Sequence, residues 1–424
     1  MNIKLRLIIM SFLQFFIWGS WLITIGAYWF QTKQWSGAQF GAIFSTMGIA
    51  SIFMPSLMGI LADKYINAEK LYGLLHLAGG IVLCTVPLVD NPGTMFWVML
   101  LNMIFYMPTL ALSIAVSYSV LKSRGGDVVK DYPPIRVWGT VGFIVALWVV
   151  SLLHFETSAN QFYVAAAAAI LLGFYSFTLP KCPPLSRATP NKTLTEALGL
   201  NSFALLKDSK MAIFFLFALL LGAALQLTNA YGDTFLHDFA TVDAYKDTIA
   251  VRYPAIIMSI SQISETLFIL AIPFFLRRFG IKQVMLFSMV AWVLRFGLFA
   301  YGNPGGGLWM IILSCIVYGM AFDFFNISGS LFVETQTHPS IRASAQGLFM
   351  MMTNGFGAVL GSSLSGLIIQ KYYTLPDNSK DWPGIWLAFA GYALVIAVLF
   401  VFLFKHQHSS RAVESPQAEP VLSA

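Results

Sequence analysis

Residues 59–65 read Gly59-Ile-Leu-Ala-Asp-Lys-Tyr65, and residues 273–282 read Pro273-Phe-Phe-Leu-Arg-Arg-Phe-Gly-Ile-Lys282. Each stretch is a short basic connection that follows the second long apolar run in its half of the chain. A matching loop at the same place in two halves is typical of membrane proteins built from paired six-helix repeats. The pair of loops therefore predicts a duplicated membrane fold.

The composition around these loops is that of a membrane protein. Of the 424 residues, 58% are apolar and 10% are charged, whereas roughly 25% are charged in soluble domains. A helix that crosses about 30 Å of hydrocarbon needs some 20 mainly apolar residues, because its backbone groups must pair internally. We expect an all-α polytopic fold with twelve transmembrane helices, near residues 8–29, 38–61, 70–89, 95–119, 134–153, 161–180, 211–236, 253–276, 282–301, 308–333, 342–370 and 384–404.

The lysines and arginines are spread unevenly over the connections between these runs. With the amino terminus in the cytoplasm, 18 of the 25 fall in cytoplasmic segments, and the outer segments hold Lys33, Lys246, Arg252, Lys371 and Lys380. The positive-inside rule then places both termini in the cytoplasm. Because these cations form no continuous patch, the net charge of +6 does not indicate a nucleic-acid partner.

The longest internal polar stretch divides the runs into two sets of six. We expect a six-helix bundle over residues 1–180, a cytoplasmic linker over 181–210, a second bundle over 211–404 and a cytoplasmic tail over 405–424. The first apolar run follows a basic start and has no small-residue cleavage site, so we interpret it as a retained span. The three cysteines lack disulfide or metal-ligand spacing, and no nucleotide-binding or metalloenzyme motif occurs. These observations predict neither an enzyme nor a metal site.

Four ionisable residues remain inside the apolar runs, namely Arg136, Glu265, Arg295 and Asp323. A charge at mid-membrane costs about 2.5–3.5 kcal/mol on insertion scales, so such residues usually face a wet cavity or a partner. A carboxylate such as Asp323 can take up and release a proton if its environment changes between desolvation and a nearby cation. The alternative interpretation of Asp323 is a permanently paired structural aspartate. Arg136 is either a functional or an interfacial, snorkelling arginine, and we interpret Arg295 as structural.

Polar residues recur on the same helix faces as these charges. Three sets share a face by their spacing: Arg136, Thr140 and Phe143; Gln226 and Asn229; Gln262 and Glu265. Amides and a carboxylate suit the hydroxyl groups of a sugar, although single membrane amides also join helices to one another. Two such pairs on helices expected to flank one cavity favour a ligand-binding role.

Two further sets of residues have a packing role as one of their interpretations. One set in the first and fourth spans either lines the cavity or packs the bundle: Gln14, Trp18, Trp21, Asn102, Tyr106, Thr109 and Ser113. Gly355, Gly357, Gly361 and Gly366 in the eleventh span are expected to be close-packing positions. Gly59 in the first basic loop is also expected to let two helices approach.

Long stretches of the chain resemble the bacterial nucleoside:proton symporter family of the major facilitator superfamily. The loop Gly59–Lys64 also resembles the signature loop of that superfamily. The likeness runs from the first helix to the last. It is carried by Ser11-Phe-Leu-Gln-Phe-Phe-Ile-Trp-Gly-Ser-Trp21, Pro133-Pro-Ile-Arg-Val-Trp-Gly-Thr140, Ser259-Ile-Ser-Gln-Ile-Ser-Glu-Thr-Leu267, Ala321-Phe-Asp-Phe-Phe-Asn-Ile-Ser-Gly329 and Ile341-Arg-Ala-Ser-Ala-Gln-Gly347.

The resemblance implies a monomer in the lipid bilayer of the bacterial inner membrane that takes up purine and pyrimidine nucleosides, such as uridine and adenosine, by alternating access. Protons would be the coupling ions, with no cofactor and no metal. Asp323 would be the proton-linked acid, with Arg136 as its partner, although Asp323 and Asn326 also leave sodium coupling open. The substrate would contact Arg136, Thr140, Phe143, Gln226, Asn229, Gln262, Glu265, Tyr318 and Phe322, of which Tyr318 and Phe322 come mainly from the resemblance.

Overall fold

The computed structural model describes residues 2–184, 200–338 and 341–406, and within them it is helical apart from connections and one isolated bridge between Thr374 and Lys380. Residues 185–199 of the expected linker and 407–424 of the expected tail lie outside the described residues. The amino-terminal half contains α1 (Ile3–Gly19), α2 (Ile25–Ala27), η1 (Tyr28–Thr32), α3 (Gly37–Lys64), α4 (Ala68–Thr85), η2 (Val86–Leu88), α5 (Pro92–Ser123), α6 (Val128–Leu152) and α7 (Asn160–Ser176).

The carboxyl-terminal half has the longer helices. Its elements are η3 (Leu200–Lys207), α9 (Ser209–Asp238), η4 (Phe239–Thr241), α10 (Ile249–Arg252), α11 (Pro254–Tyr301), α12 (Leu308–Gln336), α13 (Arg342–Met350), η6 (Met351–Gly357), α14 (Ala358–Ile368), η7 (Ile369–Tyr373) and α15 (Trp382–Leu403). Segments η1, η6 and η7 are π-helical, so the first and eleventh spans change their helical pitch along their length.

Within the described residues, nine helical segments are long and apolar enough to cross a membrane. One of them, α11, holds two expected spans, because Gly280 (φ 77°, ψ 170°) interrupts its 48 residues. Such a backbone conformation favours glycine, and it lets the chain reverse with almost no loop. Helices α1 and α7, with 17 residues each, supply the remaining two expected spans. The expectation of twelve transmembrane helices is therefore confirmed.

Local sequence explains where several of these helices begin. Ser36 and Gln39 form a capping box at the start of α3, in which each side chain pairs with a backbone N–H of the other. Asn91, Asp208 and Asp381 accept backbone N–H groups at the starts of α5, α9 and α15. Polar caps therefore fix the limits of apolar helices whose interiors carry no such signals.

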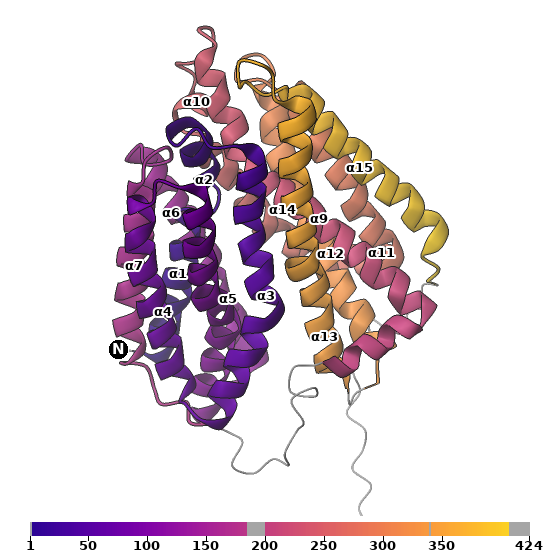
Figure 1. Cartoon of the computed structure of the whole chain (residues 1–424). Coiled ribbons are helices and arrows are strands. Elements are labelled where there is room, and N and C mark those ends of the chain that lie inside the picture. Colours follow the sequence, from indigo (N-terminus) through magenta and orange to yellow (C-terminus); the bar gives the residue numbers. More distant parts are fainter. Residues whose placement is uncertain (1, 185–199, 339–340, 407–424) are drawn as a thin grey trace, which may run out of the picture.

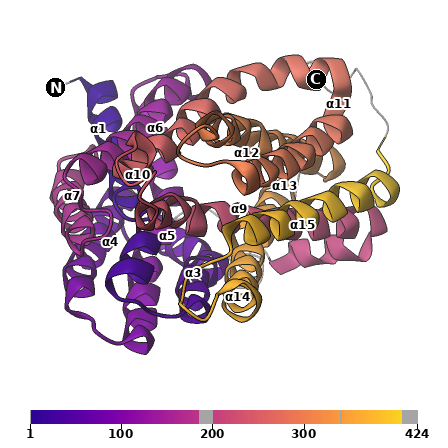
Figure 2. The same cartoon turned by 90° about the horizontal axis from the view of Figure 1, so that it is seen from above.

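The two halves lie side by side (Figures 1 and 2). The amino-terminal half is coloured indigo to purple and the carboxyl-terminal half rose to yellow. Across their interface α3 packs on α14 and η6, α6 packs on α11, and α2 packs on α9. Near the end where α10 lies, called the α10 end below, Trp148 of α6 donates a hydrogen bond to Ser259 of α11 at 2.9 Å. The core is thus one helical bundle in each half, with a contact surface between them.

A seam of small residues joins α3 to η6 and α14. A Cβ added at Gly48 would lie 2.6 Å from the carbonyl oxygen of Gly355, and Gly41 packs as closely on Ser362 and Gly366. Similar Cβ atoms at Gly357 and Gly361 would collide with the backbone of α9. No larger side chain fits at these positions. The expectation that the eleventh-span glycines permit close packing is confirmed.

The contact between the halves ends partway along α3. From Gly37 to Ala50 most residues are buried, whereas from Ser51 to Leu61 all are half-buried or exposed. A Cβ at Gly59 would meet no atom within 4 Å, so the expected close helix approach at Gly59 is wrong. The halves therefore meet at the α10 end and part towards the opposite end, where α3 finishes.

Candidate functional site

Three of the four expected mid-membrane charges lie together between the halves. The Arg136 guanidinium on α6 and the Glu265 carboxylate on α11 attract each other across the interface. Glu265 in turn lies within electrostatic range of Asp323 on α12. Among the described residues, no ion pair at contact distance includes Arg136, Glu265 or Asp323. Glu265 therefore lies within electrostatic range of the other two side chains, and these three described residues form no contact ion pair with one another.

Arg136 is positioned by α1. Its guanidinium lies 4.1 Å from the centre of the Phe15 ring, which is a cation–π contact. A Cβ at Gly139 would approach the Arg136 Nη1 atom to 2.9 Å, so glycine leaves room for the arginine to lie along α6. Arg136 is half-buried, and its charge acts on Glu265 of the other half. This placement differs from that of an arginine that snorkels to the surface.

Two aromatic rings lie next to the charged group. Tyr318 and Phe322, one turn apart on α12, stack with centroids 5.9 Å apart and planes at 3°. Tyr318 lies within electrostatic range of Glu265 and Asp323. Phe322 is half-buried, so one ring of the pair remains accessible. The chain thus presents a flat apolar surface beside two carboxylates.

Two buried oxygen atoms in this region have no hydrogen-bond partner among the described residues. They are Oε1 of Gln226 on α9 and Oδ2 of Asp323, and both side chains are almost completely buried. Buried polar atoms are normally paired, so unpaired ones mark places where a ligand, a proton or water completes the pairing. Gln226 Oε1 and Asp323 Oδ2 therefore keep a hydrogen-bonding capacity that the described protein groups leave unused.

The remaining expected site residues are less tightly associated with the charged group. Thr140, Asn229 and Gln262 are half-buried, and within the described residues their side chains make no hydrogen bond; the backbone carbonyl of Gln262 accepts one from Thr266 Oγ1 at 3.2 Å. Phe143 is 8% exposed, and its backbone carbonyl packs on α1 at Gly19. A small cavity adjoins Phe322, and its lining includes Leu225, Trp292, Asn326, Thr353 and Asn354. Leu225, Trp292, Thr353 and Asn354 were not expected from the sequence.

Arg295 has a structural place within the carboxyl-terminal half. It is 1% exposed, donates to Thr228 Oγ1 at 2.9 and 2.6 Å, and donates to the Ser314 carbonyl at 2.8 Å. Its guanidinium also lies 4.5 Å from the centre of the Tyr318 ring. Arg295 therefore joins three helices and holds Tyr318 in place behind the charged group.

Three residues of the polar set in the first and fourth spans, Gln14, Tyr106 and Thr109, are joined by hydrogen bonds inside the amino-terminal half. Gln14 donates to Thr109 Oγ1 at 2.9 Å and accepts from Tyr72 at 2.6 Å, while Tyr106 donates to its backbone carbonyl at 2.8 Å. These bonds favour packing over cavity lining for Gln14, Tyr106 and Thr109. Trp18 differs, because its buried Nε1 has no hydrogen-bond partner in the described part of the chain.

Nearly the whole chain matches one family model and several known proteins. A family model described as nucleoside H⁺ symporter matches residues 1–409. The xanthosine permease of Escherichia coli (strain K12) is 55% identical over 98% of this chain and 99% of its own length. The nucleoside permease NupG of the same strain is 53% identical over 96% of this chain and 97% of its own length.

Solved structures agree with these sequence matches. A crystal structure of nucleoside transporter NupG matches 96% of this chain and 100% of its own, with 53% identity and a TM-score of 0.90, and that of its D323A mutant has a TM-score of 0.93. A bacterial homologue of the human lysosomal transporter Spinster, in an inward-facing conformation, has a TM-score of 0.69 at 14% identity, which concerns the fold alone.

Proposed function

This chain belongs to the nucleoside H⁺ symporter family, a family of membrane transporters with the major facilitator fold, and we propose that it accumulates both purine and pyrimidine nucleosides with protons. The observation that carries this proposal is the group Arg136, Glu265 and Asp323, assembled between the halves without contact ion pairs. Such a group has charge to offer to a ligand and a carboxylate to offer to a proton.

The nucleoside base would lie against the aromatic surface. Phe322, supported by its stacked neighbour Tyr318, would pack on the base, and Phe143 would approach from the other half. A ring face accepts any base with little discrimination, which supports a broad rather than a xanthosine-only specificity. Uridine and adenosine are the substrates we would test.

The sugar and the base edges would take the polar groups. Gln226, with its unpartnered Oε1, would lie closest to such a ligand, and Asn229, Gln262, Thr140 and Glu265 would contact hydroxyl groups or base edges. Site groups that pair with a substrate become unsatisfied when the substrate lacks the matching group, and this gives selectivity.

Proton coupling would work through the chain of charges. With Asp323 protonated, the negative charge beside Glu265 falls, and Glu265 is then free to pair with Arg136 or with the nucleoside. When Asp323 releases its proton, Glu265 and Asp323 repel each other, and Arg136 becomes their common partner. This exchange of partners would link the proton to the movement of the halves in alternating access.

The same proposal includes orientation and membrane. The distribution of basic residues supports cytoplasmic termini, a cytoplasmic linker over 181–210 between bundles 1–180 and 211–404, and the bacterial inner membrane. The α10 end would then face outwards. The closed seam at that end and the parted halves at the other support an inward-facing state. We expect the monomer to be the working unit.

The deciding experiment is uptake of labelled uridine and adenosine into inside-negative proteoliposomes, with and without an inward proton gradient. We expect accumulation of both nucleosides that a protonophore abolishes. Accumulation driven by a sodium gradient instead would show that sodium, and not the proton, is the coupling ion. Uptake of one base class alone would restrict the substrate range, and no entry under any gradient would refute the proposed function.

A further inference from the structure

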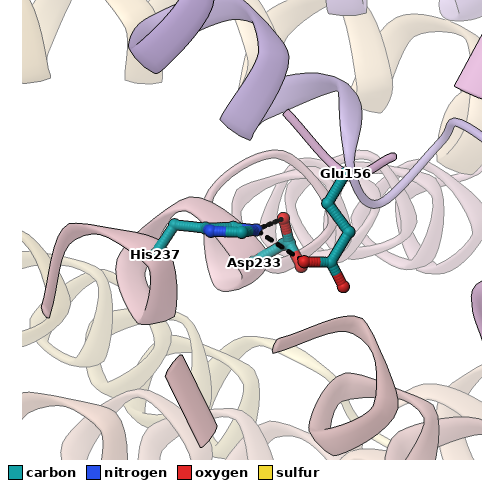
Figure 3. A group of neighbouring side chains, drawn as sticks. All are labelled: Glu156, Asp233 and His237. Carbon is teal, nitrogen blue, oxygen red and sulfur yellow. Dashed lines mark ion pairs between the residues drawn. The ribbon is translucent and has the colours of Figure 1, made fainter. Parts of the chain in front are cut away.

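At the α10 end, three ionisable side chains from both halves meet (Figure 3). Glu156 lies in the connection between α6 and α7, and Asp233 and His237 lie one turn apart near the end of α9. The Nε2 atom of His237 is 2.9 Å from Oε2 of Glu156 and 3.5 Å from Oδ2 of Asp233. The Glu156 and Asp233 side chains are 4% and 0% exposed, and that of His237 is 12% exposed.

Protein groups do not balance the charges of this cluster. Two carboxylates face one imidazole, and within the described residues the ion pairs of Glu156 and Asp233 are both with His237. Neither carboxylate oxygen of Asp233 has a hydrogen-bond partner in the same part of the chain. Because an uncompensated buried charge is strongly unfavourable, Asp233 requires either a proton or further positive charge directed at it.

We propose that Glu156, Asp233 and His237 form a binding site for one divalent transition-metal ion, of which zinc is the best chemical match. A neutral imidazole, two carboxylates and a divalent cation sum to zero charge. Zinc binds nitrogen and oxygen at about 2.0–2.2 Å, so tetrahedral ligand atoms lie roughly 3.3–3.5 Å apart. The separation of 3.5 Å between His237 and Asp233 matches this spacing, the separation of 2.9 Å between His237 and Glu156 is shorter, and all three ligand atoms lie within 4.8 Å of one another.

Neighbouring groups orient the ligands. The other oxygen of Glu156, Oε1, accepts a hydrogen bond from the backbone N–H of Ala255 at 3.0 Å, at the start of α11. Such a second contact fixes the direction of a ligating carboxylate. The spacing of Asp233 and His237, one turn apart on a helix, is also the spacing that zinc-binding helices use for their paired ligands. A fourth position remains for water.

The site is complete only when the halves meet at the α10 end. Glu156 belongs to the amino-terminal half, whereas Asp233, His237 and Ala255 belong to the carboxyl-terminal half. A ligand that binds one of two states shifts the population towards that state. Zinc on the α10 side therefore holds this end closed and slows uptake from that side.

The first test is calorimetric titration of zinc into the purified full-length chain, carrying no polyhistidine tag and pretreated with chelator. We expect one ion per chain in the wild type, and binding weakened by at least about tenfold in His237→Gln and in Asp233→Asn. The control is His154→Gln, because His154 lies nearby, with its ring stacked on Tyr253 at 5.6 Å, but outside the cluster. This readout does not depend on which solute the chain transports.

Absence of saturable binding, or unchanged binding in both cluster variants, would overturn the proposal and leave an imidazolium held between two carboxylates. Zinc-edge X-ray absorption on the wild type does not depend on how any variant folds. We expect one imidazole and otherwise oxygen ligands in the first coordination shell. Sulfur ligation by a cysteine, or ligation by several imidazoles, would place the ion elsewhere and refute the site.

Discussion

Two groups of charged side chains lie between the halves, and each combines two carboxylates with one basic residue. At the centre, Arg136, Glu265 and Asp323 interact through space, and the described residues show no contact ion pair among them. At the α10 end, Glu156, Asp233 and His237 are paired and nearly inaccessible to solvent. The same set of charges is thus placed once where the interface is open and once where it is closed. The central group is the one that we propose to exchange its partners for a nucleoside and a proton.

The largest effect is expected from Asp323→Asn, which removes the proton from the central group. The amide neither gains nor loses a proton, so we expect no accumulation but continued nucleoside exchange. Accumulation and counterflow in proteoliposomes measure these two activities separately. Asp243→Asn is the matched control, because Asp243 is exposed and pairs with Lys246 on the surface. Accumulation driven by a pH gradient in Asp323→Asn would show that Asp323 does not carry the proton.

A smaller but still large effect is expected from Glu265→Gln. Loss of this carboxylate leaves Arg136 without its counter-charge and removes an acceptor from the site. Hydrogen bonds to charged groups contribute about 1.5–3 kcal/mol, so the affinity for uridine should fall by roughly 10- to 150-fold.

Calorimetric titration of uridine into purified protein gives this affinity directly. The control is Glu334→Gln, because Glu334 is half exposed and pairs with Arg342 away from the site. A change of less than twofold in Glu265→Gln would remove Glu265 from the binding site.

The closed end itself is tested by Gly41→Ala. The added methyl group collides with Ser362 and Gly366, and such overpacking costs about 1–3 kcal/mol. Because the collision arises only when the seam is closed, we expect the initial rate of uptake to fall by at least about fivefold, in line with that cost. Gly59→Ala is the matched control, since a Cβ there meets no atom within 4 Å. Equal rates in the two variants would show that the seam does not limit transport.

The smallest effect is expected from an exposed pair at the α10 end. Lys33 Nζ lies 2.7 Å from Asp90 Oδ1, yet the Asp90 side chain is 90% exposed. Exposed pairs contribute about 0–1 kcal/mol, whereas breaking a buried pair leaves an unpaired charge. Asp90→Asn should therefore lower the thermal unfolding temperature less than Glu156→Gln does. If Asp90→Asn lowered the unfolding temperature more than Glu156→Gln, burial would not determine how much the pairing of Glu156 with His237 contributes to stability.

Much of the fold and part of the central group follow from local sequence. The twelve spans are predicted because apolar length is a local property, and Arg136, Glu265 and Asp323 stand out because charges are rare in such runs. The roles of the individual site residues remain predictions. Partners on other helices are not local, so the bonds from Arg295 to Thr228 and Ser314 could not be foreseen.

The α10 cluster was missed for the same reason. Glu156 lies in a connection and meets Asp233 only after both halves have folded and joined. One signal was overlooked: Asp233 lies inside the expected span 211–236 and belongs with the four ionisable residues named for the apolar runs, and His237 follows it at the next turn. The small residues of the seam were recognised on the eleventh span but not on α3. Whether a glycine on α3 has room for a larger side chain depends on the helix packed against it, which the sequence does not show.

The early end of the glycine seam makes α3 a lever. Its backbone is fixed against its neighbour as far as Gly48, and the helix continues to Lys64 without such support. At 1.5 Å per residue the free arm is about 24 Å long, so a tilt of about 10° at Gly48 carries its tip roughly 4 Å. A tilt of α3 too small to disturb its packed end therefore moves its far end by several times the displacement near Gly48. The position of the last packed glycine sets the length of the helix that moves.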